Sequence, residues 1–227
     1  MRPVSMNPAP RPRFAARLCR DLSGLAAVEF ALAAPVVLAI FLSGAEITNF
    51  AITKMRLSQT ALHVADNASR IGTDSLLTAP QISEKQINDL LIGANMQAGS
   101  LDLAGRGRVI ISSLEPMADP NTTGRFKIHW QRCYGAKSFP SSYGVAGDTN
   151  LTGMGPTGQR ATAPEGGGVI FVEIAYDYEP LFSDRLIPNR TIHEIAAMTV
   201  RDDRDYQGPA PDYGGIYNSE GVTASTC

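Results

Sequence analysis

The sequence is poor in cysteine, histidine and tryptophan, and it has almost no net charge. Its 227 residues include three cysteines, three histidines and one tryptophan, with a formal net charge of −2. A near-neutral chain lacks the strongly basic surface typical of nucleic-acid binding, so we expect no nucleic-acid partner. His63, His129 and His193 lie far apart, without the spacing to Cys, Asp or Glu that metal sites show. We interpret them as surface or packing residues.

Sequence signatures of catalysis are also lacking. There is no G-x-S-x-G motif and no nucleotide-binding glycine loop, and the glycines at 166–168 are typical of a turn before a strand. An acidic set near the C-terminus has no EF-hand spacing, so a solvated acidic rim is favoured over a weak Ca²⁺ site. We therefore predict a protein that is not an enzyme and has neither cofactor nor metal. The acidic set comprises Glu173, Asp177, Glu179, Asp202, Asp203 and Asp205.

Positive charge is concentrated at the N-terminus. Residues 1–24 are rich in Arg and Pro, show no helical or strand period, and contain one acid, Asp21. Lys and Arg beside a membrane span favour its cytoplasmic side, so we interpret residues 1–24 as a basic cytoplasmic leader. The arginines are Arg2, Arg11, Arg13, Arg17 and Arg20.

One long apolar run follows the leader. Residues 25–45 read LAAVEFALAAPVVLAIFLSGA and contain one charged residue, Glu29. As a helix the run would extend about 31 Å, the thickness of a hydrocarbon core, which predicts a transmembrane helix. Pro35 inside it should be tolerated, as prolines are in membrane helices. Residues 46–227 would then form an extracytoplasmic domain in the periplasm, anchored by a single pass.

Helical periodicity continues beyond the apolar run. Apolar residues recur at steps of three and four as far as Gly72, opposite a polar side, which predicts an amphipathic extension of the same helix. A second helix is predicted from Ser83 to about Met96. The apolar side of the extension is expected to comprise Ile47, Phe50, Ala51, Met55, Ala61, Leu62, Ala65 and Ala68.

After Gly107 the apolar period changes to two. Strands are predicted over 108–114, 124–133, 168–178 and 191–200, the first two as a hairpin and the last returning antiparallel. Residues 134–168 resemble a long surface loop. The fold class is α+β: a long N-terminal helix packed on a small, mainly antiparallel sheet. One strand face should hold Ile170, Val172, Ile174, Tyr176 and Tyr178, and another Phe126, Ile128 and Trp130.

The cysteines divide by compartment in this topology. Cys19 lies in the leader, on the reducing side, whereas Cys133 and Cys227 would face an oxidising periplasm and could form a disulfide. Two free or buried thiols remain the alternative.

The start of the apolar run holds an unusual carboxylate. Charged groups in membrane helices are costly and usually have a partner or a role, although near the membrane boundary a snorkelling residue costs less. If the chain were cut after Gly24, Glu29 would be the fifth residue of the new chain. The amine of Leu25, on the same or a neighbouring subunit, could then neutralise it.

Gly24 precedes the run AAVEF at residues 26–30. Glycine followed by AAVEF resembles the prepilin-type processing motif of the Tad (tight adherence) system. The run GLAAVEFALAAPVVL is similar to the N-terminal region of TadE-like pseudopilins, and VEIAYDYEPLF resembles their Tyr-rich late strand. The resemblance implies a pilin-like fold, a processing site at Gly24 and Leu25, and a prepilin motif that includes Glu29 and Phe30. It further implies a non-catalytic minor pilin or assembly factor, with a prepilin peptidase, other Tad pilins and an inner-membrane assembly platform as partners.

A rival processing site lies further along the chain. Ser43, Gly44 and Ala45 precede Glu46 and offer the small residues that signal peptidase prefers. Cleavage there would give a secreted protein, and no cleavage a tethered one. The alternative function is therefore a membrane-tethered or secreted periplasmic binding module with no pilus role.

Overall fold

The computed structural model describes residues 23–72, 79–182, 190–201, 204–212 and 214–227. The chain divides into two compact units, Met1–Glu46 and Ile47–Cys227, each described by itself below. The leader, with Cys19 and its arginines, lies outside the described residues except for Ser23 and Gly24.

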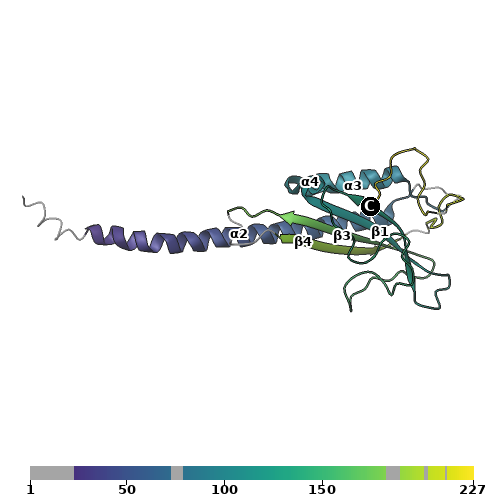
Figure 1. The fold of residues 1–227 in the computed structure, drawn as a ribbon, viewed down its shortest axis with the longest axis horizontal. Helices are drawn as coiled ribbons and strands as arrows, with labels where there is room; N and C mark the ends of the chain where they lie inside the picture. The colour runs from purple at the N-terminus through teal and green to yellow at the C-terminus, as the bar shows by residue number, and fades with distance from the viewer. Residues whose placement is uncertain (1–22, 73–78, 183–189, 202–203, 213) are drawn as a thin grey trace, which may run out of the picture. The chain divides into compact units, whose positions relative to one another are not determined.

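The first described element is the helix α2, Ser23–Arg70, which has 48 residues and contains Pro35 (Figure 1). This confirms one continuous helix of the expected length. In the first unit most of its apolar side chains are exposed. In the second unit one side of the helix belongs to a buried core, through Leu57, Ala61, Val64, Ala65 and Ala68.

The second unit is a four-stranded sheet covered by helices on one face. The strands are β1 (Gly107–Pro116), β2 (Phe126–Tyr134), β3 (Val169–Tyr178) and β4 (Arg190–Thr199). Their order is β2-β1-β3-β4 and every neighbouring pair is antiparallel, as the α+β prediction required.

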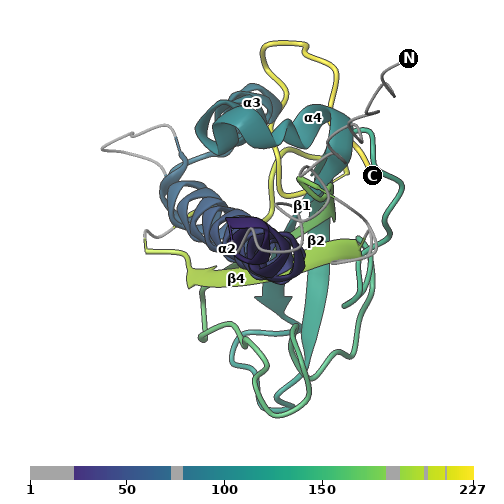
Figure 2. The same ribbon diagram turned by 90° about the vertical axis from the view of Figure 1, so that its left-hand side faces the viewer.

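Three shorter helical elements follow α2 in the chain. Ser83 caps α3 (Glu84–Ala98) by accepting a hydrogen bond from Gln86 N at 3.3 Å, while Gln86 Oε1 accepts one from Ser83 N at 3.0 Å. The 3-10 helix η1 (Gly99–Leu101) and the short helix α4 (Leu103–Arg106) then lead into β1 (Figure 2). Neither of these two short elements was expected from the sequence.

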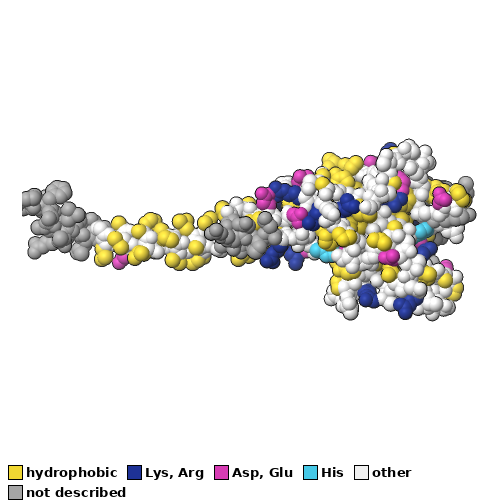
Figure 3. Space-filling view, viewed as in Figure 1, with side chains coloured by type: hydrophobic (Ala, Val, Ile, Leu, Met, Phe, Trp, Pro, Cys, Tyr) yellow, Lys and Arg dark blue, Asp and Glu magenta, His cyan; other side chains and the backbone are white. Residues whose placement is uncertain are grey.

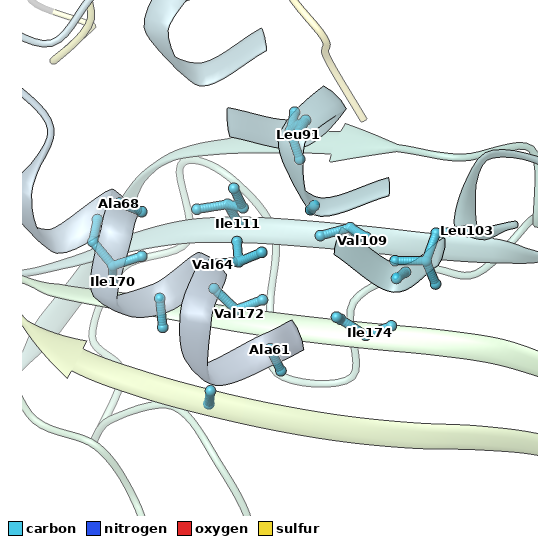
Figure 4. Close-up of a cluster of buried hydrophobic side chains, with 14 of the residues drawn as sticks. Ala61, Val64, Ala68, Leu91, Leu103, Val109, Ile111, Ile170, Val172 and Ile174 are labelled. Atoms are coloured by element: carbon cyan, nitrogen blue, oxygen red, sulfur yellow. The ribbon is translucent and has the colours of Figure 1, made fainter. Parts of the chain in front are cut away.

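The main core lies between the helices and one face of the sheet. Ala61, Val64 and Ala68 of α2 and Leu91 of α3 cover the middle strands (Figure 4). The expected face of β3 is confirmed, because its alternate residues from Ile170 to Tyr178 all join this core. Side chains from one face of a sheet and one stripe of each helix make a continuous apolar layer, which stabilises the unit.

The opposite face of the sheet carries a smaller core. Leu114, Phe126, Ile128, Val169 and Phe171 gather there with Met154, which is fully buried. Met154 belongs to the predicted loop of residues 134–168, which contains no helix or named strand, only isolated bridges. The loop therefore covers this face of the sheet.

The predicted face of β2 is wrong at Trp130. The pairing of β1 with β2 passes from Ser112 opposite Gln131 to Leu114 opposite Ile128, so β2 has one extra residue there. Such a bulge shifts every later side chain to the other face. Trp130 consequently joins the main core, whereas Phe126 and Ile128 remain in the smaller one.

The predicted apolar side of the helix extension is also partly wrong. Leu57 and Val64, which that side omitted, are at most 1% exposed, whereas Met55 and Leu62, which it included, are 58% and 48% exposed. The helix has two apolar stripes at helical spacing, and helical periodicity alone does not separate them. Only one of the stripes packs on the sheet.

Paired substitutions on α2 test this assignment. We expect Leu57→Ala to lower the free energy of unfolding of the second unit by about 2–5 kcal/mol, because it opens a cavity in the core. Met55→Ala should change it by no more than about 0.5 kcal/mol, because the side chain is exposed. Urea unfolding of the detergent-solubilised protein, followed by circular dichroism, measures both. Equal destabilisation by the two would contradict the assignment.

Cys133 and Cys227 are bonded in the structure, 94 residues apart in sequence. Backbone hydrogen bonds also hold the C-terminal tail. Glu84 N donates to Tyr217 O, Tyr217 N to Ile82 O, and Cys133 N to Ser225 O at 2.7 Å. The disulfide therefore closes a tail that already lies beside α3 and β2.

We expect the disulfide to form in the exported protein. Without reductant, a maleimide should label no cysteine outside the leader, and labelling of Cys133 and Cys227 would contradict the pairing. Replacing both paired cysteines by alanine should lower the free energy of unfolding by about 2–5 kcal/mol, because the cross-link restricts a long loop in the unfolded chain. Thermal unfolding of the oxidised protein and the double variant measures the difference.

Candidate functional site

The residues of the expected processing site lie together at the start of α2. Gly24 is its second residue, and the side chains of Leu25 and Phe30 are 59% and 73% exposed. Glu29 is exposed as well. A Cβ atom on Gly24 would meet no atom of the chain within 4 Å. Nothing within the described chain therefore requires glycine at this position, and any requirement must come from another molecule.

The helix that follows exposes almost all its apolar side chains. Leu32, Ile40 and Phe41 are 67–72% exposed, and no residue in the most apolar window of the helix, whose mean hydropathy is 2.4, is buried (Figure 3). Among the described residues it is the one helix long and apolar enough to cross a membrane. Such an exposed surface is unstable in water, so it requires lipid or protein to cover it. The helix is thus compatible with a single-pass anchor.

A second exposed apolar surface lies on α2 within the second unit. Ile47 is 60% exposed, Met55 58% and Leu62 48%, and Ala51 is also exposed. We call these four residues the outer stripe of α2. Their spacing puts them on one side of the helix, away from Leu57 and Val64 in the core. The outer stripe is available to another protein.

Two histidines lie beside buried glutamates. His129 Nδ1 is 2.8 Å from Glu115 Oε2, and His193 Nε2 is 3.3 Å from Glu173 Oε1. Glu115 and Glu173 are 4% and 0% exposed. Glu173 also accepts hydrogen bonds from Ser141 Oγ and Ser142 N. Buried carboxylates need such partners, so these groups serve packing. No motif or periodicity indicated that the two glutamates are buried.

A third buried glutamate joins α3 to the sheet. Glu84 is 5% exposed, and Arg132 Nε on β2 donates to its Oε2 at 2.9 Å. Removing one member of such a pair leaves an uncompensated charge, so the pair constrains how α3 docks on β2.

The acidic set near the C-terminus does not assemble into a metal site in the described residues. Lys137 Nζ donates to Asp177 at 2.6 Å and, with Thr191, lowers the pKa of that carboxyl. Arg106 pairs with Glu179. No group of three or more His, Cys, Asp or Glu in the described ranges could hold a metal ion. Asp202 and Asp203 lie outside the described residues.

A cavity of about 690 Å³ lies at one end of β1 and β2. Glu115, Lys127 and Asp205 contribute charge to its wall, and Tyr206 contributes a ring. Burial alone would raise the pKa of Asp205. Hydrogen bonds from the Tyr217 hydroxyl and from the backbone N–H groups of Gln207 and Gly208 outweigh burial and lower it. The mixed charge suits a small polar ligand but forms no recognisable catalytic arrangement.

The sequence model of one protein family, described as TadE-like protein, matches residues 24–72. No curated protein and no solved structure matches the chain. The match begins at the glycine of the expected processing site and extends to the end of α2. Residues 24–72 are therefore TadE-like, which confirms the resemblance carried by the run GLAAVEFALAAPVVL.

Proposed function

We propose that this chain is a pseudopilin, or minor pilin, that acts without catalysis in assembly of a Tad pilus. One observation carries the proposal: the TadE-like segment coincides with the exposed apolar helix whose first turns contain Gly24 and Glu29. A helix that served only as an anchor would need neither the glycine nor the carboxylate at its start.

The precursor would be held in the inner membrane by residues 25–45, with its leader in the cytoplasm and its folded unit in the periplasm. A prepilin peptidase would then cut after Gly24 and leave Leu25 as the new N-terminus. The released helix would pack among the helices of other pilins. Small side chains allow helix backbones to approach closely in such packing. The helix provides Ala26, Ala27, Ala31, Ala33, Ala34 and Ala39.

The folded unit would present a docking surface to pilins or to the assembly platform. The outer stripe of α2 supports this role, because three of its large apolar side chains are 48–60% exposed on a helix whose other side is in the core. Exposed apolar stripes on helices are typical of helix–helix contacts.

Sequencing the mature N-terminus tests the proposal. A mature chain that begins at Leu25 supports a pseudopilin. A chain that begins at Glu46 indicates a secreted module, and an uncut chain indicates a plain anchor. The cells should carry the complete pilus gene set, so that the peptidase is present. Either of the last two results would overturn the proposal.

The alternative is a tethered or secreted binding module. The cavity beside Glu115 and Tyr206 favours it, because a hollow of about 690 Å³ is large enough for a small ligand. In that case deleting the gene should leave pili unchanged.

A further inference from the structure

The end of the second unit where β3 finishes and β4 begins lies against the start of that unit's part of α2 (Figure 1). Asn49 Nδ2 donates to the Tyr178 hydroxyl at 2.9 Å, and the rings of Phe50 and Tyr178 meet edge to face with centroids 5.1 Å apart. The Arg190 guanidinium lies 5.9 Å from the centre of the Phe50 ring. These contacts tie Tyr178 and Arg190 to residues 49 and 50.

The position of these residues along the chain sets their depth. Asn49 is only four positions after Ala45, the end of the apolar run, which is about 6 Å at the rise of a helix. The headgroup region outside the hydrocarbon is roughly 5–8 Å thick on each side of a bilayer. If residues 25–45 span the membrane, as the proposed function requires, Tyr178 and Arg190 fall at the level of the lipid headgroups.

The side chains at this end match that environment. Leu181 and Phe182, which follow β3, are 58% and 52% exposed. A hollow of about 500 Å³ at this end of the unit has four charged residues in its lining: Arg106, Asp177, Glu179 and Arg190. Arg190 is exposed, and among the described residues no carboxylate lies within ion-pair distance of it. Apolar side chains beside an arginine suit a membrane interface, where the apolar groups enter the layer and the cation binds lipid phosphate.

We propose that this end of the unit, comprising Arg106, Leu181, Phe182 and Arg190, docks on the outer surface of the inner membrane. Its occupant is the headgroup layer of the phospholipids. Leu181 and Phe182 enter that layer, and the guanidinium of Arg190 binds lipid phosphate, with Arg106 beside it in the same hollow. Docking fixes the orientation of the folded unit on the membrane before assembly, so the outer stripe of α2 is presented in one direction.

Nitroxide labels on the full-length protein test the proposal in nanodiscs of phosphatidylethanolamine and phosphatidylglycerol. The background variant Cys19→Ser leaves an introduced cysteine as the one reactive thiol, because Cys133 and Cys227 are bonded. Labels are placed through Leu181→Cys at the docking surface, Val37→Cys in the span, and Val145→Cys. Val145 is 53% exposed in the loop on the other face of the sheet. Collision rates with a water-soluble nickel complex are compared with those of oxygen.

Docking predicts that the label at 181 collides with nickel several-fold less often than the label at 145. A label at 181 as accessible as the one at 145, with the label at 37 protected, would overturn docking and leave the span and the pseudopilin proposal intact. A label at 37 exposed to nickel would overturn the span itself, and docking with it.

A charge reversal then tests the guanidinium. Arg190→Glu should raise the nickel collision rate at position 181 several-fold, because it replaces attraction to lipid phosphate by repulsion. Arg125→Glu makes the same charge change at an exposed arginine outside this surface and should have no effect. Unchanged protection in Arg190→Glu would refute the role of Arg190.

Discussion

We expect Gly24→Val to leave the protein in the membrane as the full-length precursor. A membrane protease must bring the peptide before the scissile bond close to its own backbone, and a branched side chain there would obstruct that approach. In the isolated chain a Cβ atom on Gly24 meets nothing within 4 Å. The variant should therefore insert and fold normally, so that loss of cleavage is its main effect. The mass of the membrane-bound protein measures the result.

Gly44→Val is the matched control. Gly44 also lies in α2, also follows a serine, and also has no atom within 4 Å of an added Cβ. The Gly44→Val protein should be cleaved after Gly24 as the parent protein is, because the valine is remote from that bond. A mature mass of normal size from Gly24→Val would refute the processing site. A product that begins at Glu46 in both proteins would instead identify the rival site.

Much of the fold could be predicted because the apolar periods of its segments are regular. The long helix, α3 and all four strands were found within a few residues of their bounds. The capping box of Ser83 and Gln86 marks the start of α3 in the sequence itself. The antiparallel hairpin of β1 and β2 followed from two alternating segments joined by a turn that contains Asp119 and Pro120.

The errors arose where tertiary packing decides between patterns that look alike. The bulge in β2 depends on pairing with β1, and nothing in the alternation from Phe126 to Trp130 indicates it. The two apolar stripes of α2 have the same spacing, so only the sheet reveals that Leu57 is in the core and Met55 is not. Burial of Glu115 and Glu173 likewise depends on partners distant in sequence.

The candidate sites divide in the same way. The segment from Gly24 to Phe30 could be found from sequence because it is a short local motif, and the structure adds that its residues are exposed. The proposed docking surface could not be found, because it depends on contacts of Tyr178 and Arg190 with α2 residues more than 120 positions earlier. Local sequence patterns reveal short motifs, whereas a surface formed by residues distant in sequence can be found only from the fold.

Glu29 provides the sharpest distinction between a pseudopilin and a plain anchor. For an anchor, Glu29→Leu should insert as well as the parent or better, because it removes a carboxylate that costs a few kcal/mol at the bilayer centre and less near an end. In a pseudopilin cut after Gly24, Glu29 lies one helical turn from the new amine of Leu25. Residues four apart on a helix are neighbours, so the carboxylate can reach that amine or the amine of an adjacent subunit.

We expect Glu29→Gln to insert and to be cleaved but to assemble few or no pili. The substitution keeps the size and polarity of the side chain and removes its charge, so the amine of a subunit would enter the apolar surroundings of the filament without a counter-charge. Glu29→Asp is the matched control: it keeps the charge on a shorter side chain and should retain more pili than Glu29→Gln.

Membrane fractionation, mature mass and counts of surface pili, all in one strain, measure these effects. Normal piliation in Glu29→Leu would show the carboxylate to be a bystander and would remove a main support of the proposed function. Normal fractionation and normal mature mass combined with lost pili would place the role of Glu29 in assembly, after insertion and cleavage are complete.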